Sequence, residues 1–130
     1  MTDLIDVKTA DLSGEALGWA VGKAEGLDLY LEPPGYNGVP WRVFARYQGS
    51  VTERSERYNP WSDWALGGPL MEANNVSIHC PQHDNDCWAA WITKDDKDVV
   101  HGGRVLPAAC RAIIAAKLGD TVQVPKELMP

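Results

Sequence analysis

The stretch LPAACRAIIAAKL, residues 106–118, decides the class of fold. Its apolar side chains recur at helical spacing, and Pro107 suits the first turn of a helix. Gly119 follows directly, at the position where glycine commonly ends a helix. The pattern therefore predicts a helix over about residues 106–118, with this apolar face turned to the core: Leu106, Ala109, Cys110, Ile113 and Ala116.

A second helix is predicted over about residues 13–25, because its apolar residues also follow helical spacing and Gly26 stands just past its end. Short helical turns are predicted near residues 62–74. There, the pair Gly67-Gly68 is expected to interrupt the first turn, and Pro69 is expected to begin the next one.

Alternating apolar and polar residues predict short strands between these helices. One hairpin is expected from residues 41–47 and 51–58, and another from residues 76–80 and 88–92. Two principal helices and several short strands, without a regular alternation of the two, predict an α+β domain with a small, mainly antiparallel sheet.

Length and composition set the broad class of protein. The chain has 130 residues, which predicts a single domain over 1–130. No apolar run approaches the ~18 residues that span a bilayer, and the acidic start MTDLIDVK is unlike a signal peptide. A net charge of −6 argues against binding to duplex nucleic acid, and three cysteines favour a reducing cytoplasm.

Tryptophan and tyrosine are unusually frequent, with six Trp and four Tyr against one Phe. These amphipathic rings suit recognition surfaces as well as a small core. The segment from Tyr58 to Leu70 holds two of the tryptophans, and its helix start would present free N–H groups to an anion. In the alternative interpretation, Asp63 simply caps its own helix and Trp64 fills the core.

Arginines are concentrated in the first predicted hairpin. Four of the six fall within residues 42–57: Arg42, Arg46, Arg54 and Arg57. A guanidinium presents a planar set of donors that matches phosphate or carboxylate, and the neighbouring tyrosines could stack on a base. The hairpin is therefore a candidate lid over an anion site. Alternatively, its charges serve only solubility and protect the edge of the sheet.

One cluster has the residue types of a metal site. Cys80, His83 and Cys87 lie on the loop between the strands of the second hairpin, and sulfur and imidazole are ligands that zinc accepts. Their spacing matches none of the common zinc motifs, so a polar loop is the alternative. Cys110 lies on the apolar face of the last predicted helix and is expected in the core.

Common catalytic motifs are absent from the chain. It contains no GxGxxG, no GxxxxGK[ST], no HExxH and no GxSxG. This disfavours dinucleotide enzymes, P-loop NTPases, zincins and α/β-hydrolases, and no catalytic residues are predicted.

Three segments in order resemble the phage NinX-like family of small proteins from tailed phages and prophages. They are LGWAVGKAEG (17–26), YNPWSDWALGGPL (58–70) and the helix with KLGD and VP after Ala112. The chain departs from the family pattern at Trp61, where Ser is common, and at Cys110, where Met is common. The resemblance implies a phage protein acting in the bacterial cytoplasm, without an assigned activity. The chain follows the family pattern at Trp19, Tyr58, Asp63, Trp64, Gly67, Gly68, Pro69, Trp88, Ala89, Pro107 and Arg111.

Together these observations predict a non-enzymatic binding protein for a small anionic, nucleotide-like ligand or for a host regulatory protein. No cofactor is expected unless the cysteine and histidine loop binds zinc. The alternatives are a zinc-stabilised interaction module and a nucleotide-processing enzyme that uses Asp63 and a histidine. The predicted ligand-binding residues are Trp19, Arg42, Arg46, Arg57, Tyr58, Asp63, Trp64, Gly67, Gly68 and Arg111.

Overall fold

The computed structural model describes residues 3–49, 51–82, 87–92 and 100–129, with the backbone alone over 100–102. Its helices and strands follow one another without a regular alternation. They are β1 (Leu4–Lys8), α1 (Gly14–Ala24), β2 (Asp28–Glu32), β3 (Arg42–Gln48), β4 (Glu53–Arg57), α2 (Trp64–Ala73), β5 (Val76–His79), β6 (Trp88–Ile92), β7 (Val100–Gly102), α3 (Val105–Lys117) and β8 (Thr121–Pro125), with short 3₁₀ turns at Thr9–Asp11, Tyr36–Gly38 and Lys126–Leu128.

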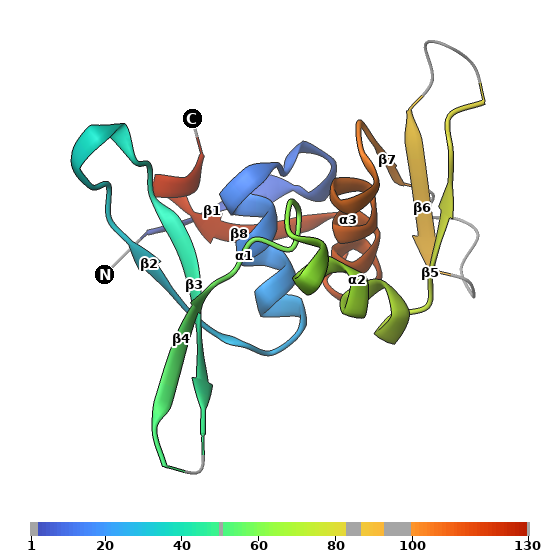
Figure 1. Ribbon diagram of the computed structural model, residues 1–130. Coiled ribbons are helices and arrows are strands. Elements are labelled where there is room, and N and C mark those ends of the chain that lie inside the picture. The colour runs from blue at the N-terminus through green and yellow to red at the C-terminus, as the bar shows by residue number, and fades with distance from the viewer. Residues whose placement is uncertain (1–2, 50, 83–86, 93–99, 130) are drawn as a thin grey trace.

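The strands form small antiparallel sheets on either side of the helices. In Figure 1, α1 and α3 lie between the sheet β2-β3-β4 and the sheet β5-β6-β7. The strands β1 and β8 form a separate ribbon, with Val7 opposite Val122, and so join the two ends of the chain. The pairing is antiparallel throughout, which confirms the predicted α+β class.

The two predicted principal helices are confirmed, with α1 at Gly14–Ala24 and α3 at Val105–Lys117. Both end as the sequence indicates. Gly26 and Gly119 follow the last turns with φ of +75° and +95°, in the left-handed region where a side chain would be strained.

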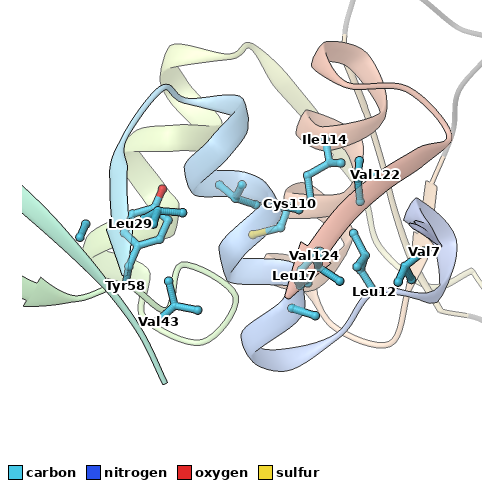
Figure 2. Packing of buried hydrophobic residues seen from close by; sticks show 14 residues of the cluster. Val7, Leu12, Leu17, Leu29, Val43, Tyr58, Cys110, Ile114, Val122 and Val124 are labelled. Atoms are coloured by element: carbon cyan, nitrogen blue, oxygen red, sulfur yellow. The ribbon is translucent and has the colours of Figure 1, made fainter. Parts of the chain in front are cut away.

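The main core lies between α1, α3, the β1-β8 ribbon and the inner face of the β2-β3-β4 sheet (Figure 2). Leu17 on α1, Ile114 on α3 and Val43 on β3 are fully buried there. Val43 and Ala45 alternate with more exposed neighbours along β3, as predicted for a strand with one face against the core. Burial of this apolar surface is the main source of stability for the fold.

A smaller core lies on the other side of α3. Ala108 and Ala112 are buried against Ala90 on β6, and Trp88 packs at the edge of this cluster. Small side chains on both elements let the helix lie close to the sheet. The helix α3 therefore serves both cores, which explains why its sequence is apolar over more than one face.

One expectation for residues 62–74 is wrong. A single helix, α2, runs through Gly67-Gly68 and holds Pro69 in its interior. Proline removes one helical hydrogen bond, but both ends of this short helix are held. The Asp63 carboxylate accepts from the Ala65 N–H at its start, and the Asn74 amide donates to the Leu70 carbonyl at its end. No helix among the described residues is both long and apolar enough to cross a membrane.

Candidate functional site

A cavity of about 540 Å³ opens where the start of α2, the start of α3 and the first residue of β6 come together. Three tryptophans and one arginine are among its walls. We call it the tryptophan cavity. Its lining residues are Trp61, Ser62, Trp64, Trp88, Arg104, Val105, Leu106 and Pro107.

The turn before α2 positions Trp61 and Ser62. The carbonyl of Asn59 accepts from the N–H groups of Ser62 and Asp63 at 3.0 and 2.9 Å. The Asn59 side-chain amide also donates to the Ser62 hydroxyl oxygen at 2.9 Å. These bonds hold the turn in one shape, so that Trp64 begins α2 directly beside the cavity.

Gly67 sets the distance between α2 and α3. A Cβ at this position would stand 2.6 Å from the Leu106 side chain and 2.7 Å from the Pro60 carbonyl oxygen. Glycine alone fits there, because each of these separations is below van der Waals contact. The same Leu106 lines the cavity, so this close approach fixes two of its walls relative to each other.

The three indoles of the tryptophan cavity differ in burial. Trp64 is 58% exposed, while Trp88 is half-buried against the smaller core. Trp61 packs against Gly18 of α1, and its indole N–H is buried without a hydrogen-bond partner among the described residues. No aromatic or cation–π contact that the structure describes involves these three rings. The exposed ring of Trp64 is therefore the surface most open to a planar guest, with the cavity-facing parts of Trp61 and Trp88 beside it.

The start of α3 is poorly satisfied compared with the start of α2. Arg104 stands at its N-cap position without a side-chain cap hydrogen bond, and no acidic residue lies in its first turn. Arginine is a poor N-cap and places a positive charge at the positive end of the helix dipole. At the start of α2, by contrast, Asp63 accepts from the Ala65 N–H at 2.9 Å.

Arg104 also differs from the other five arginines. Its side chain is exposed and makes no hydrogen bond, ion pair or ring contact within the described ranges of the chain. Each of the others has a partner described below. The tryptophan cavity thus holds an arginine without a partner among the described residues, and a guanidinium of this kind has the donors that an anion requires.

Of the predicted ligand-binding residues, Trp64 alone is among the residues that line the cavity. Asp63, Gly67 and Gly68 are close by on α2, where Asp63 caps the helix. Tyr58 lies in the main core at 2% exposure, and its burial raises the pKa of the hydroxyl above its ordinary value. The structure therefore brings together only part of the predicted site.

Trp19 and Arg111 lie apart from this lining. The ammonium of Lys23 stands 5.0 Å from the centre of the Trp19 ring, and Trp19 packs against the main core. Arg111 donates from Nε to the Leu12 carbonyl at 3.0 Å, and partial burial lowers the pKa of its guanidinium. The Lys23 contact of Trp19 lies within α1, whereas Arg111 joins α3 to the segment that precedes α1.

We call β3 and β4, with their four arginines, the arginine hairpin. Arg57 pairs with Glu15 on α1 and also donates to the Val43 carbonyl at 3.1 Å. Glu15 accepts from the Val43 N–H at 2.9 Å as well, so the ion pair joins the first turn of α1 to the sheet. Arg57 therefore holds the hairpin against α1.

The other hairpin arginines also have partners within the chain. The Arg46 guanidinium stands 4.2 Å from the centre of the Tyr30 ring and pairs with Asp28 at 3.2 Å. Arg54 pairs with Glu56 at 3.1 Å and lies over the Tyr47 ring.

Arg42 lies over the Phe44 ring and donates to the Pro33 carbonyl at 3.5 Å. Each arginine of the hairpin thus has at least one contact within the chain, although the Arg42 Nε is buried without a hydrogen-bond partner among the described residues. The arrangement matches the interpretation of the hairpin as a charged surface more closely than that of a lid.

The predicted zinc ligands are only partly described. Cys80 is exposed and Cys87 is half-buried, while His83 lies outside the described residues. Within the described part of the chain, no group of three His, Cys, Asp or Glu side chains is placed to hold a metal ion. Cys110 is buried in the main core as expected, and burial raises the pKa of its thiol to about 12.

Sequence reasoning missed most of the cavity lining. Trp61 lies in one of the family-like segments and Trp88 at a position that follows the family pattern, but only folding places them on one cavity. Arg104 carries a weak local signal: an arginine stands where a helix beginning at Val105 would ordinarily have Ser, Thr, Asp or Asn as its cap.

Comparison with known protein families gives a match over most of the chain. The family model described as "Bacteriophage P22, NinX" matches residues 8–117, which include every described residue of the cavity lining. A comparison with curated proteins finds no similar sequence.

Proposed function

The chain belongs to the bacteriophage P22 NinX family and is thus a phage accessory protein, and from that premise we propose that it is a non-enzymatic binding protein. Its ligand is a small, anionic, nucleotide-like molecule of the host cytoplasm. The site is the tryptophan cavity, with Trp61, Trp64 and Trp88 as stacking surfaces and Arg104 as the anchor for the anion.

One observation carries the proposal: a cavity is lined by three indoles without ring partners and by an arginine without a partner among the described residues. Its volume, about 540 Å³, is in the usual range for small-molecule sites. Aromatic walls with a few polar groups are typical of such sites.

The charges around the cavity favour an anion over a cation. Tryptophan cages also bind quaternary ammonium groups through cation–π contacts. Here, however, Arg104 and the positive end of the α3 dipole face the same space, and no Asp or Glu is among the described residues that line it. A cationic guest would be repelled.

A cavity of this kind supports a small ligand better than a protein partner. A host regulatory protein would be expected to cover a flat exposed patch. The large hydrophobic side chains that are most exposed, Tyr36 and Val51, lie away from the cavity and from each other in the chain. If native mass spectrometry finds a bound protein in place of a small molecule, the proposal of a small ligand is contradicted.

The test is native mass spectrometry of the protein purified under mild conditions from infected cells, followed by calorimetric titration with the molecule that it retains. Trp64→Ala is expected to weaken binding about tenfold or more, because one stacked ring contributes ~1–3 kcal/mol. Since Trp64 is 58% exposed, the variant should fold normally.

Trp41→Ala is the matched control, because Trp41 is partly buried and does not line the cavity. It should bind as well as the unchanged protein. Equal binding by all three proteins would contradict the assignment of the site, and conversion of the ligand into a product would contradict the non-enzymatic role.

A further inference from the structure

Resting on the proposed function, we infer that the tryptophan cavity selects a planar ring that carries a single anionic group. A nucleoside monophosphate and an aromatic carboxylate share this chemistry. Uncharged nucleosides and polyanions such as nucleoside triphosphates are the guests that the cavity disfavours.

The ring requirement comes from the indoles. Trp61 and Trp64 approach the cavity from the turn and first residue of α2, and Trp88 approaches from the start of β6. A flat guest between these elements can stack on more than one ring, and stacking tolerates any base because each has a π-face.

The limit to a single anionic group follows from the cations that are available. Among the described residues that line the cavity, Arg104 alone carries a positively charged side chain. One guanidinium fork can hold one phosphate or carboxylate through two parallel hydrogen bonds. A second or third phosphate would find no further cation among the described residues of this lining.

The rest of the molecule disfavours polyanions as well. The chain carries a net charge of −6, so each added phosphate on a guest is repelled by the protein as a whole. The arginines of the arginine hairpin cannot compensate, since Asp28, Glu56 and Glu15 already pair with three of them.

Calorimetric titration with adenosine, AMP, ATP and 2-naphthoate tests this selectivity. AMP is expected to bind at least tenfold more tightly than adenosine and than ATP. GMP and UMP should behave like AMP, because stacking is tolerant of the base. Tighter binding of AMP than of 2-naphthoate would identify the anionic group as a phosphate. Tighter binding of 2-naphthoate would identify it as a carboxylate.

Arg104→Ala tests the contribution of the charge to affinity separately from that of ring stacking. This variant should bind AMP no more tightly than adenosine, a loss of about tenfold, while its affinity for adenosine stays within twofold. Arg46→Ala is the matched control, since it removes the same charge from a surface that does not line the cavity. It should leave the preference for AMP over adenosine unchanged.

The outcomes are distinct for the two proposals. If adenosine or ATP binds more tightly than AMP and 2-naphthoate, the inference of a guest with a single anionic group is wrong and the binding site itself stands. If no probe binds and the purified protein retains no small molecule, both proposals fall. Tight binding of 2-naphthoate alone supports the inference and identifies the anion as a carboxylate.

Discussion

The arginine hairpin and the tryptophan cavity contain the same ingredients, aromatic rings and arginines, and use them in opposite ways. In the arginine hairpin, guanidinium groups lie over Tyr30, Phe44 and Tyr47 and pair with carboxylates or a carbonyl of the chain. In the tryptophan cavity, neither Arg104 nor the indoles have such partners within the described residues. The two regions share residue types. The proposed binding site differs from the stabilised surface because its rings and its guanidinium group do not already have such partners.

If the charges of the arginine hairpin are structural, the largest effect should follow from removing the carboxylate that anchors it. Glu15→Ala leaves the Arg57 guanidinium with only the Val43 carbonyl as an acceptor and the Val43 N–H with none, in a partly buried place. We expect a loss of about 2 kcal/mol in the free energy of unfolding, measured by urea denaturation.

Glu15→Gln is the matched variant, because its amide oxygen can still accept from Val43. It should lose only about half as much stability. A Glu15→Ala protein as stable as the unchanged chain would show that the arginine hairpin is not held by this pair, and its arginines would again be candidates for ligand binding.

The walls of the tryptophan cavity allow a second test through two adjacent glycines. Gly67→Ala places a methyl group against Leu106 and the Pro60 carbonyl, and overpacking of this kind costs ~1–3 kcal/mol. Gly68→Ala meets no atom within 4 Å and gains helix propensity, so it should be neutral or stabilising by up to ~1 kcal/mol.

Thermal unfolding of the two variants, side by side, measures the difference. Opposite signs at neighbouring positions would establish that α2 is held tightly against α3 along one face. Equal effects would mean that the two walls are not in close contact, and the shape of the tryptophan cavity would then be less defined than its lining suggests.

The smallest effect on stability, and the most informative one, concerns Arg104. Arg104→Ser introduces a proper N-cap and removes a positive charge from the positive end of α3, so stability should rise by about 1 kcal/mol. The same variant should bind AMP about tenfold less tightly. Urea denaturation and calorimetry on one protein preparation check both expectations.

A gain in stability together with a loss of binding would show that Arg104 is retained at a structural cost. Destabilisation by Arg104→Ser would contradict this, since it would mean that the arginine already has a stabilising role in the free protein. Arg104 would then be a structural residue, like the arginines of the arginine hairpin.

Much of the local structure could be predicted from the sequence, because the signals are local. Helical spacing with Gly26 and Gly119 placed α1 and α3, and alternation placed the strands of both hairpins. The signals failed at α2. There, Gly67 and Pro69 indicate a break, whereas the cap at Asp63 and the packing against Leu106 hold one continuous helix.

The site was less predictable because it depends on contacts between distant segments. Trp64 was identified from a distinctive turn, but Trp88 and Arg104 join it only through the packing of β6 and α3. Conversely, Arg57 was an attractive anion ligand in the sequence until folding placed Glu15 against it. No local pattern records which arginine has found a partner elsewhere in the chain.

The amino-acid sequence by itself determined the helices, the hairpins, the α+β class and the likeness to a phage family, because periodicity, caps and motifs act over a few residues. Only the tertiary structure decided which charges are neutralised and which rings remain open. Ion pairs such as Glu15–Arg57 join residues far apart along the chain, and their formation depends on the packing of the whole core.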